Sequence, residues 1–429
     1  MTIPPVIPLD TNCERSSTTT SGELFDGFFT SGRTWGYDKN AILDVRGRRL
    51  FGMMSLACQE DCYPYQVPLE SRTGPWVQAE GRRMLMLSSY DYLSLVGDQR
   101  IEAAAIAAIR RFGSASGGAR LLTGTNVLHL QIEKDLAAFK GTDAALTFSS
   151  GYNANLGVIS GLFTPQDRVI LDSLSHRSLV DACRLAGVQL QRYRHNDLDS
   201  LRGELRSGTG NRTLIVADGV FSMDGDICPL PELIQIKRDF GCLLMIDDAH
   251  AIGVLGETGH GTDEHYGCRT SDVDLWTGSL AKSIPSTGGF IAMSEEVAVF
   301  LQHSASPYIF SAALCPASSG AIREGLAILN AEPQLVARLR DRANYLRAGL
   351  QDLGYDTGSS KTPIIPVIMK DEEAALRLSR ALRDHSILVS PVVFPAVALG
   401  TARLRICVNA GHTIADLDHT LDAFRKLRK

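Results

Sequence analysis

Two kinds of apolar pattern alternate along most of the chain from about residue 102. Apolar residues at helical spacing occupy residues 101–112, 129–141, 178–187 and 230–241. Short apolar runs, typical of strands, occupy residues 144–150, 167–172, 188–194, 212–220, 242–250 and 273–279. This alternation predicts an α/β fold with a mostly parallel, doubly wound sheet and helices on both of its faces.

The pattern changes after about residue 321. A long helical stretch at residues 321–354 is interrupted near Pro333, and strands and helices then alternate at residues 363–369, 371–386, 402–410 and 413–427. This order predicts a second, smaller α+β domain. We therefore expect a flexible tail at residues 1–35, an arm or part of the small domain at residues 36–95, a large ligand-binding domain at residues 96–325 and a small C-terminal domain at residues 326–429.

Composition and charge exclude several classes of protein. The chain has 429 residues, of which 44% are hydrophobic and 21% charged, and its formal net charge is -5 with no block of like charge. We therefore expect no nucleic-acid partner and no membrane surface. The longest apolar runs have the length of strands, so we expect no transmembrane segment. The first residues are rich in Pro, Ser and Thr without a basic leader or apolar core, which predicts a cytoplasmic chain.

The nine cysteines are scattered along the chain, and Cys58 and Cys62 form the only close pair. No second pair of cysteine or histidine accompanies them at the spacing of a zinc site. We therefore expect free thiols and no metal.

Polar residues stand at the carboxyl ends of the predicted strands. They are Ser149, Ser150, Gly151, Asp172, His176, Ser222, Asp247, His250 and Lys282. Ligands of open α/β sheets bind outside the carboxyl ends of the strands. These residues are therefore expected to converge on one crevice.

Lys282 lies in a run of small residues, TGSLAKSIPSTGG, at residues 277–289. A phosphate-binding Walker loop requires glycine directly before the lysine and again five residues earlier. Ala281 and Trp276 occupy those positions, so a nucleoside triphosphatase is not expected. A lysine can also form a Schiff base with pyridoxal phosphate (PLP). That chemistry requires a carboxylate for the pyridinium nitrogen, a group that stacks on the ring and donors for the phosphate.

The chain offers each of these partners. Asp247 ends an apolar strand and can pair with the pyridinium, although a capping or hydrogen-bonded aspartate is the alternative. His250 can contact the phenolic oxygen and His176 can stack on the ring, whereas either histidine alone is more often structural. The phosphate donors would be the backbone N–H groups of Ser150, Gly151 and Tyr152 at a helix N-terminus, with Ser279. The combination of these residues indicates a PLP site more specifically than any one of them does.

Many separated segments resemble the α-oxoamine synthase family of fold-type-I PLP enzymes, in the family's order. They are residues 113–125, 139–157, 171–182, 219–233, 245–261, 277–290, 308–316 and 402–413. The resemblance runs from about residue 45 to the C-terminus. Residues 277–291, with residues 63–71 and 81–95, look closest to the serine palmitoyltransferase branch and its bacterial relatives.

The resemblance implies a role for each matching residue. Lys282 would bind the cofactor and later act as the base, Asp247 would pair with the pyridinium, and His176 would stack on the ring. Ser222 and His250 would contact the phenolic oxygen, and Ser279 would hold the phosphate. Arg405 would bind the substrate carboxylate, with Arg403 as the competing choice. The family forms homodimers with shared active sites, in which Ser311 would reach the phosphate of the partner subunit.

The implied reaction joins an amino acid to an acyl thioester, carried on coenzyme A or a carrier protein. Loss of the carboxylate as CO2 gives an α-amino ketone and a free thiol. An aminotransferase or an aldol-type lyase on the same fold is the alternative. A non-catalytic regulatory subunit is disfavoured because Lys282 is present.

Four positions depart from the family pattern. Asp218 and Asp248 stand where the family has glutamate, and each is one methylene shorter. Tyr90 replaces an asparagine that lies near the substrate in relatives, so it is expected to alter which amino acid fits. Ala312 replaces a threonine and removes one possible phosphate ligand.

Overall fold

The structure, a computed structural model, describes residues 63–208, 210–394 and 396–428 and a few isolated positions between 42 and 58. The chain divides into two units, Met1–Pro64 and Tyr65–Lys429. The tail predicted at residues 1–35 lies outside the described residues, as does Cys62. All elements discussed below belong to the second unit.

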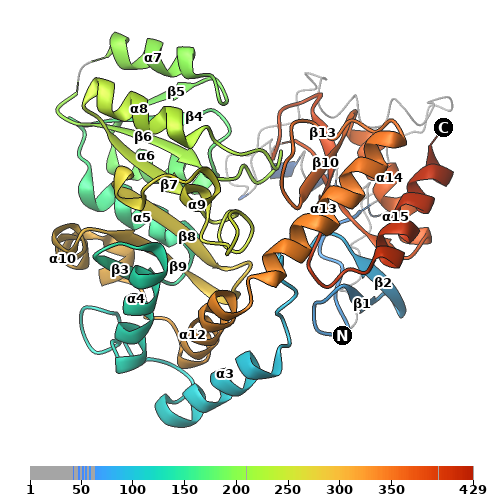
Figure 1. Cartoon of the computed structure of the whole chain (residues 1–429), viewed down its shortest axis with the longest axis horizontal. Coiled ribbons are helices and arrows are strands. Elements are labelled where there is room, and N and C mark those ends of the chain that lie inside the picture. The colour runs from blue at the N-terminus through green and yellow to red at the C-terminus, as the bar shows by residue number, and fades with distance from the viewer. Residues whose placement is uncertain are drawn as a thin grey trace. The chain divides into compact units, whose positions relative to one another are not determined.

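A seven-stranded sheet organises the first part of this unit (Figure 1). Its strands, in chain order, are β3 (Ala144–Phe148), β4 (Arg168–Asp172), β5 (Gln189–Tyr193), β6 (Thr213–Asp218), β7 (Leu243–Asp247), β8 (Leu275–Ala281) and β9 (Pro285–Met293). Their spatial order is β3-β9-β8-β7-β6-β4-β5. Neighbours from β5 to β8 run parallel, whereas β9 is antiparallel to both β8 and β3. The predicted mostly parallel sheet is confirmed, and β9 is a strand that the apolar pattern did not reveal.

Alternating side chains of each strand fill a separate core on each face of the sheet. In β7, Leu244 and Ile246 point into one core, and Met245 points into the other. The first core is covered by α3 (Gln99–Phe112), α4 (Val127–Lys140), α7 (Leu198–Ser207), α8 (Leu230–Phe240) and α12 (Pro316–Ala331). The second is covered by α5 (Gly151–Leu162), α6 (Arg177–Ala186), α10 (Glu295–Ser304) and α11 (Ser306–Ile309). The helices predicted on both faces are therefore present.

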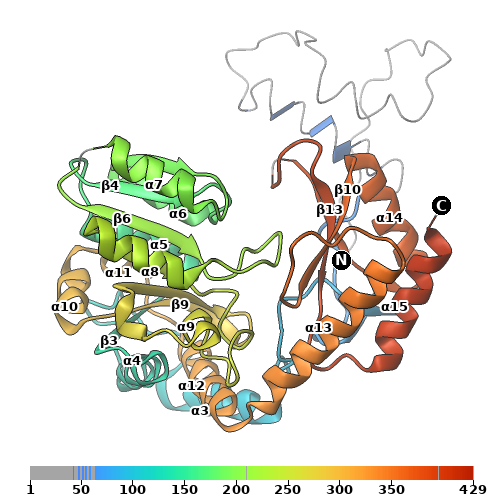
Figure 2. The same ribbon diagram turned by 45° about the horizontal axis from the view of Figure 1, so that its top comes forward.

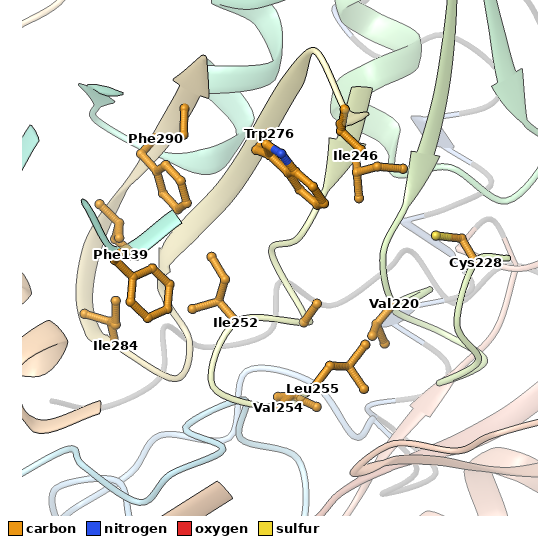
Figure 3. Close-up of a cluster of buried hydrophobic side chains, with 14 of the residues drawn as sticks. Phe139, Val220, Cys228, Ile246, Ile252, Val254, Leu255, Trp276, Ile284 and Phe290 are labelled. Atoms are coloured by element: carbon orange, nitrogen blue, oxygen red, sulfur yellow. The ribbon is translucent and has the colours of Figure 1, made fainter. Parts of the chain in front are cut away.

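Large aromatic side chains close the first core (Figure 3). Trp276 and Phe290, from the paired strands β8 and β9, lie near Phe139 of α4 and Ile252. Trp276 and Phe290 are fully buried. Burying a large apolar side chain contributes about 1.5–3 kcal/mol. This packing fixes β8, whose carboxyl end carries Lys282, against β7.

The C-terminal part forms an α+β arrangement (Figure 2). Its antiparallel sheet has the order β10-β13-β12 and consists of β10 (Ile364–Lys370), β12 (Ser390–Val392) and β13 (Ala402–Cys407). A second sheet has the order β1-β2-β11 and consists of β1 (Trp76–Ala79), β2 (Arg82–Met86) and β11 (Ile387–Leu388). The helices α13 (Gln334–Asp352), α14 (Glu372–Asp384) and α15 (Ile414–Leu427) pack around them.

One helix joins the two regions. Leu339 of α13 lies in the core of the large sheet, and Leu346 of the same helix lies in the core of the C-terminal part. The pairing of β2 with β11 also places residues 82–86 against the C-terminal part. The four domain boundaries stay a prediction. None of the helices within the described ranges combines the length and apolar character that a membrane crossing requires.

Candidate active site

A cavity of about 190 Å³ lies at the carboxyl ends of β6, β7 and β8. Its lining consists of Ser150, Gly151, Tyr152, Asn155, His176, Asp218, Val220, Asp247, Ala249, His250, Ser279 and Lys282. Eight of the residues predicted from the sequence therefore meet here: Ser150, Gly151, Tyr152, His176, Asp247, His250, Ser279 and Lys282. Asn155 and Asp218 join them as further polar groups.

One wall of the cavity is the start of α5. Ser150 caps this helix, and its Oγ accepts a hydrogen bond from the backbone N–H of Asn153 at 3.1 Å. Within the described part of the chain, no acceptor pairs with the backbone N–H groups of Gly151 and Tyr152. A Cβ at Gly151 would lie 3.4 Å from Ser279, so the turn packs closely on β8. Free N–H groups at a helix N-terminus beside a serine hydroxyl fit a phosphate.

Asp247 is a buried carboxylate that ends β7. Its Oδ2 accepts from Nδ2 of Asn155 at 2.7 Å, and its Oδ1 accepts from the backbone N–H of Ala249 at 3.0 Å. Among the described side chains, no cation forms an ion pair with it. Two donors stabilise the charged form, and a buried carboxylate also favours a cationic partner. A pyridinium nitrogen in the cavity fits this requirement, so the residues present suit PLP.

Asp218 lies beside Asp247, directly across the β6–β7 pair. Burial, and after it the nearby charge of Asp247, raise the pKa of Asp218 well above its usual range. Asp218 also accepts from the backbone N–H of His176 at 3.2 Å. The protonated form of Asp218 leaves the negative charge on Asp247, where the cavity needs it.

A hydrogen-bond relay connects Asp247 to His176. Nδ2 of Asn155 also donates to Oγ of Ser178 at 2.8 Å, and that oxygen lies 2.7 Å from Nδ1 of His176. The backbone N–H of Ser178 donates to the same Nδ1 at 3.3 Å. Because Nδ1 accepts, a neutral His176 ring carries its proton on Nε2. Burial lowers the pKa of His176, against the opposing effect of Asp247, and thus favours this neutral form.

His250 is held by a second relay. The hydroxyl of the fully buried Tyr92 lies 2.8 Å from Nδ1 of His250. Burial, followed by the charges of Lys282 and Arg405, lowers the pKa of His250 well below its usual range. Burial raises the pKa of Tyr92, and the nearby charge of Arg405 opposes that effect. Arg405 therefore lies close to the Tyr92–His250 pair that borders the cavity.

The two arginines of β13 have different surroundings. Arg403 forms an ion pair with Asp224, with Nη1 2.5 Å from Oδ1. Arg405 donates from Nε to the carbonyl of Ser222 at 2.5 Å and from Nη1 to Sγ of Cys407 at 3.0 Å. No carboxylate within the described residues pairs with Arg405. This difference favours Arg405 over Arg403 as the group that binds a substrate carboxylate.

Lys282 follows β8 and faces the cavity. Burial lowers its pKa to about 8, while the charge of Asp247 opposes that effect. No hydrogen bond or ion pair to another described residue engages Nζ. A partly buried amine with a lowered pKa and no partner is a suitable nucleophile and base near neutral pH.

The remaining predicted residues lie outside the cavity lining. Ser222 contributes its carbonyl to Arg405, and Oγ of Ser311 donates to the carbonyl of Pro307 at 2.5 Å in the same chain. Tyr90 is 50% exposed and is among the groups that raise the pKa of Arg405 against the effect of burial. The hydroxyl of Tyr152 donates to Asp181 at 2.8 Å, so only the backbone of Tyr152 suits the phosphate. The roles assigned to Ser222, Ser311 and Tyr90 stay predictions.

Asp248, one of the departures from the family pattern, belongs to a structural network. Its Oδ2 lies 2.9 Å from Nζ of Lys140, and Oδ1 accepts from Oγ1 of Thr262 at 2.6 Å. Lys140 also pairs with Asp263 at 2.6 Å and lies 3.7 Å from the centre of the Trp276 ring. The shorter side chain at position 248 is therefore matched by a buried lysine.

The fold and the cavity together define a PLP-dependent transferase of fold type I. The family model described as aminotransferase class I and II matches residues 82–424. The chain belongs to this family and, within it, to the α-oxoamine synthases.

Relatives from two branches resemble the chain. The 8-amino-7-oxononanoate synthase of Exiguobacterium sibiricum is 42% identical over 362 residues, covering 84% of this chain and 93% of that protein. The enzyme of the same name from Symbiobacterium thermophilum is 40% identical over 361 residues, covering 84% and 92%. The solved structure of Sphingomonas wittichii serine palmitoyltransferase is 32% identical, with a TM-score of 0.86, and covers 90% of this chain and 98% of that one. A further serine palmitoyltransferase structure, 31% identical with a TM-score of 0.86, contains PLP.

Proposed function

We propose that this chain joins an amino acid to an acyl thioester, releases CO2 and the free thiol, and forms an α-amino ketone. The observation that carries the proposal is the cavity in which Lys282, Asp247 and His176 meet the N-terminus of α5. When bound, PLP supplies an aldehyde carbon that reacts with amines and a ring that withdraws electrons from the α-carbon. The protein must hold that group, orient the amino acid and move the α-proton.

Three parts of the cavity would hold the cofactor. The N–H groups of Gly151 and Tyr152, with the hydroxyl of Ser279, would bind the phosphate. Asp247 would accept a hydrogen bond from the protonated ring nitrogen, and Asn155 and Ala249 keep that carboxylate in place at 2.7 and 3.0 Å. A fixed, charged carboxylate strengthens electron withdrawal because it keeps the ring nitrogen protonated.

Lys282 performs the proton transfers. Its pKa of about 8 leaves a useful fraction of the amine neutral near physiological pH, so Nζ can take the proton from the α-carbon. The same Nζ, then protonated, returns a proton to the carbon from which CO2 has left. No other described side chain binds Nζ, so it is free to move between these positions.

Arg405 and His176 orient the amino acid. Arg405 has donors without a carboxylate partner, and the neutral His176 presents an Nε2–H. We assign both to the substrate carboxylate. Tyr90 lies close enough to Arg405 to influence its pKa and is half exposed, so we assign it to selection of the amino-acid side chain.

We further propose that the enzyme is a homodimer with shared active sites. Leu122 and Phe310 are 77% and 82% exposed, and a backbone pairing of Ala119 with Ala312 brings their segments together. Large exposed apolar side chains on adjoining segments are typical of a protein interface. Light scattering after size exclusion should give twice the chain mass. A cytoplasmic location likewise stays a prediction.

A spectral and product assay tests the proposed reaction. PLP-loaded protein is titrated with glycine, L-alanine and L-serine, and an acyl-CoA is then added. The proposal expects an amino acid to change the cofactor absorbance and the thioester then to release thiol, with thiol release lost in Lys282→Ala. Rapid formation of a keto acid from the amino acid alone would instead establish an aminotransferase. The absence of any spectral response would contradict PLP chemistry at this site.

A further inference from the structure

A half-buried histidine outside the cavity bridges two carboxylates. His195, two residues after β5, has Nδ1 3.0 Å from Oδ1 of Asp172 and Nε2 2.7 Å from Oδ2 of Asp226. Burial lowers its pKa, but the two carboxylates outweigh burial and raise it to about 10. At neutral pH the ring is therefore a cation that donates from both nitrogens.

Asp226 belongs to a closed loop, residues 219–228, which we call the 219–228 loop. Val220 and Ile227 pair across its base, and the N–H of Phe221 donates to the carbonyl of Asp226 at 3.0 Å. The His195 ring packs edge-on against Phe221, with ring centres 4.4 Å apart. Nδ2 of Asn196 donates to Asp226 at 3.0 Å. His195 and its neighbour thus hold the base of the loop.

The tip of the same loop contacts the strand that carries the substrate arginine. The carbonyl of Ser222 accepts from Nε of Arg405, and Asp224 pairs with Arg403. The carbonyl of Gly225 accepts from the N–H of Lys361 at 3.0 Å and from Oγ1 of Thr362 at 2.9 Å. A Cβ at Gly225 would lie 2.0 Å from the carbonyl of Ile364, so the tip fits tightly. Displacing this loop must displace the anchor of the Arg405 guanidinium.

We infer that His195 is a positioning residue, which holds the 219–228 loop so that Arg405 remains directed at the carboxylate of the amino acid. The inference rests on the proposed role of Arg405 and extends it to a residue that does not touch the cavity. Without the cation, the buried carboxylates of Asp172 and Asp226 repel each other across the space that the ring occupied. Asp226 is the partner able to move, because it lies in a loop whereas Asp172 ends β4, a strand paired on both sides.

His195→Gln removes the charge and leaves one amide in its place. The matched control is Arg194→Gln, because Arg194 is the adjacent residue and its exposed ion pair with Asp197 does not involve the loop. Asp226→Asn is a milder variant that keeps the shape of the loop residue. PLP absorbance and the melting temperature of each loaded protein establish that it is folded and holds the cofactor.

The decisive readout separates the carboxylate from the amine. Dissociation constants for L-serine and ethanolamine, and for L-alanine and ethylamine, are measured from the change in cofactor absorbance. We expect His195→Gln to weaken amino-acid binding about tenfold and Asp226→Asn to weaken it less, while both change amine binding by less than about twofold. Arg194→Gln should behave as the unmodified enzyme.

Unchanged amino-acid binding in folded His195→Gln, or equal weakening for amino acids and amines, would overturn the inference. Failure of the proposed reaction gives a different result. In that case the unmodified enzyme releases no thiol from acyl-CoA, whereas the binding constants still report whether His195 positions Arg405.

Discussion

Replacing Lys140 by methionine tests how much its buried ion pairs with Asp248 and Asp263 contribute to the stability of the fold. Asp248 directly follows Asp247, so these pairs also hold the turn after β7. Nζ of Lys140 lies 2.9 Å from Asp248 and 2.6 Å from Asp263, and the three side chains are 0%, 1% and 6% exposed. Methionine retains most of the apolar length but removes the cation. Two buried carboxylates are then left without their partner.

The structure predicts how much free energy of unfolding Lys140→Met loses and how that loss depends on pH. Removing one partner of a buried ion pair costs about 3–5 kcal/mol, because the other charge stays buried without compensation. Burial already raises the pKa of Asp248, against the opposing effect of Lys140, so loss of the lysine raises it further. An aspartate whose pKa is higher in the folded state destabilises the fold at high pH, and protonation relieves that cost as pH falls. The deficit should therefore be larger at pH 8 than at pH 5.5.

Urea unfolding followed by circular dichroism measures this deficit. Lys134→Met is the matched control, because Lys134 is an exposed lysine of the same helix and its replacement should cost less than about 0.5 kcal/mol. Equal unfolding midpoints for the two variants would refute the reasoning. A deficit of Lys140→Met that grows at pH 5.5 would refute it as well.

Three further predictions concern the cavity. Ser178→Ala removes the hydroxyl beside Nδ1 of His176, so kcat/KM should fall about fivefold to tenfold. ¹⁵N NMR of this variant should show a mixture of His176 tautomers, whereas Ser178→Thr should retain one tautomer. Asp247→Asn removes the charge that pairs with the ring nitrogen, so thiol release should fall by about 10²–10³-fold, and a smaller loss measured with saturating PLP would remove Asp247 from the mechanism. The rate at which the apoprotein captures PLP, followed by absorbance, should rise with pH up to about 8 and then level off. The reason is that burial lowers the pKa of Lys282 to about 8 and that only the neutral amine reacts. A capture rate that is independent of pH between 6 and 9 would contradict this prediction.

The apolar pattern was sufficient for the helices α3, α4, α6 and α8 and for the parallel strands of the large sheet, but it did not reveal α7, α10 or α11. Parallel strands between two helical layers are apolar throughout, as in β6 and β7, and are therefore easy to find. The strand β9 was missed because its first residues, PSTGG, have the composition of a turn. They form a strand because Gly289 allows close approach to the start of α5, where a Cβ would lie 2.4 Å from the N atom of Gly151.

The candidate site was predictable where a residue follows a strand and carries unusual chemistry. Asp247 and Lys282 meet both conditions. Asn155 and Ser178 do not, because each lies inside a helix and acts only through another side chain. Asn155 stands four residues after Gly151, which is one helical turn, and this spacing is the only signal that could have placed it beside the cavity.

The His195 bridge was not predictable for a related reason. Asp172, His195 and Asp226 are far apart in the sequence and meet only because β4 and β5 are neighbours in the sheet. The sequence marks Asp172 only as one more acid at a strand end, and the structure directs it away from the cavity. Strand order decides such contacts, and the apolar pattern does not contain it.

The central claim is that this cavity couples loss of CO2 to the use of a thioester. The most direct measurement supplies PLP-loaded enzyme with amino acids labelled with ¹⁴C in the carboxyl group and with an acyl-CoA, and follows ¹⁴CO2 and thiol together. The account predicts equal amounts of both products, dependence of ¹⁴CO2 on the thioester, and loss of both in Lys282→Ala. Release of ¹⁴CO2 without thioester, or thiol without ¹⁴CO2, would contradict it.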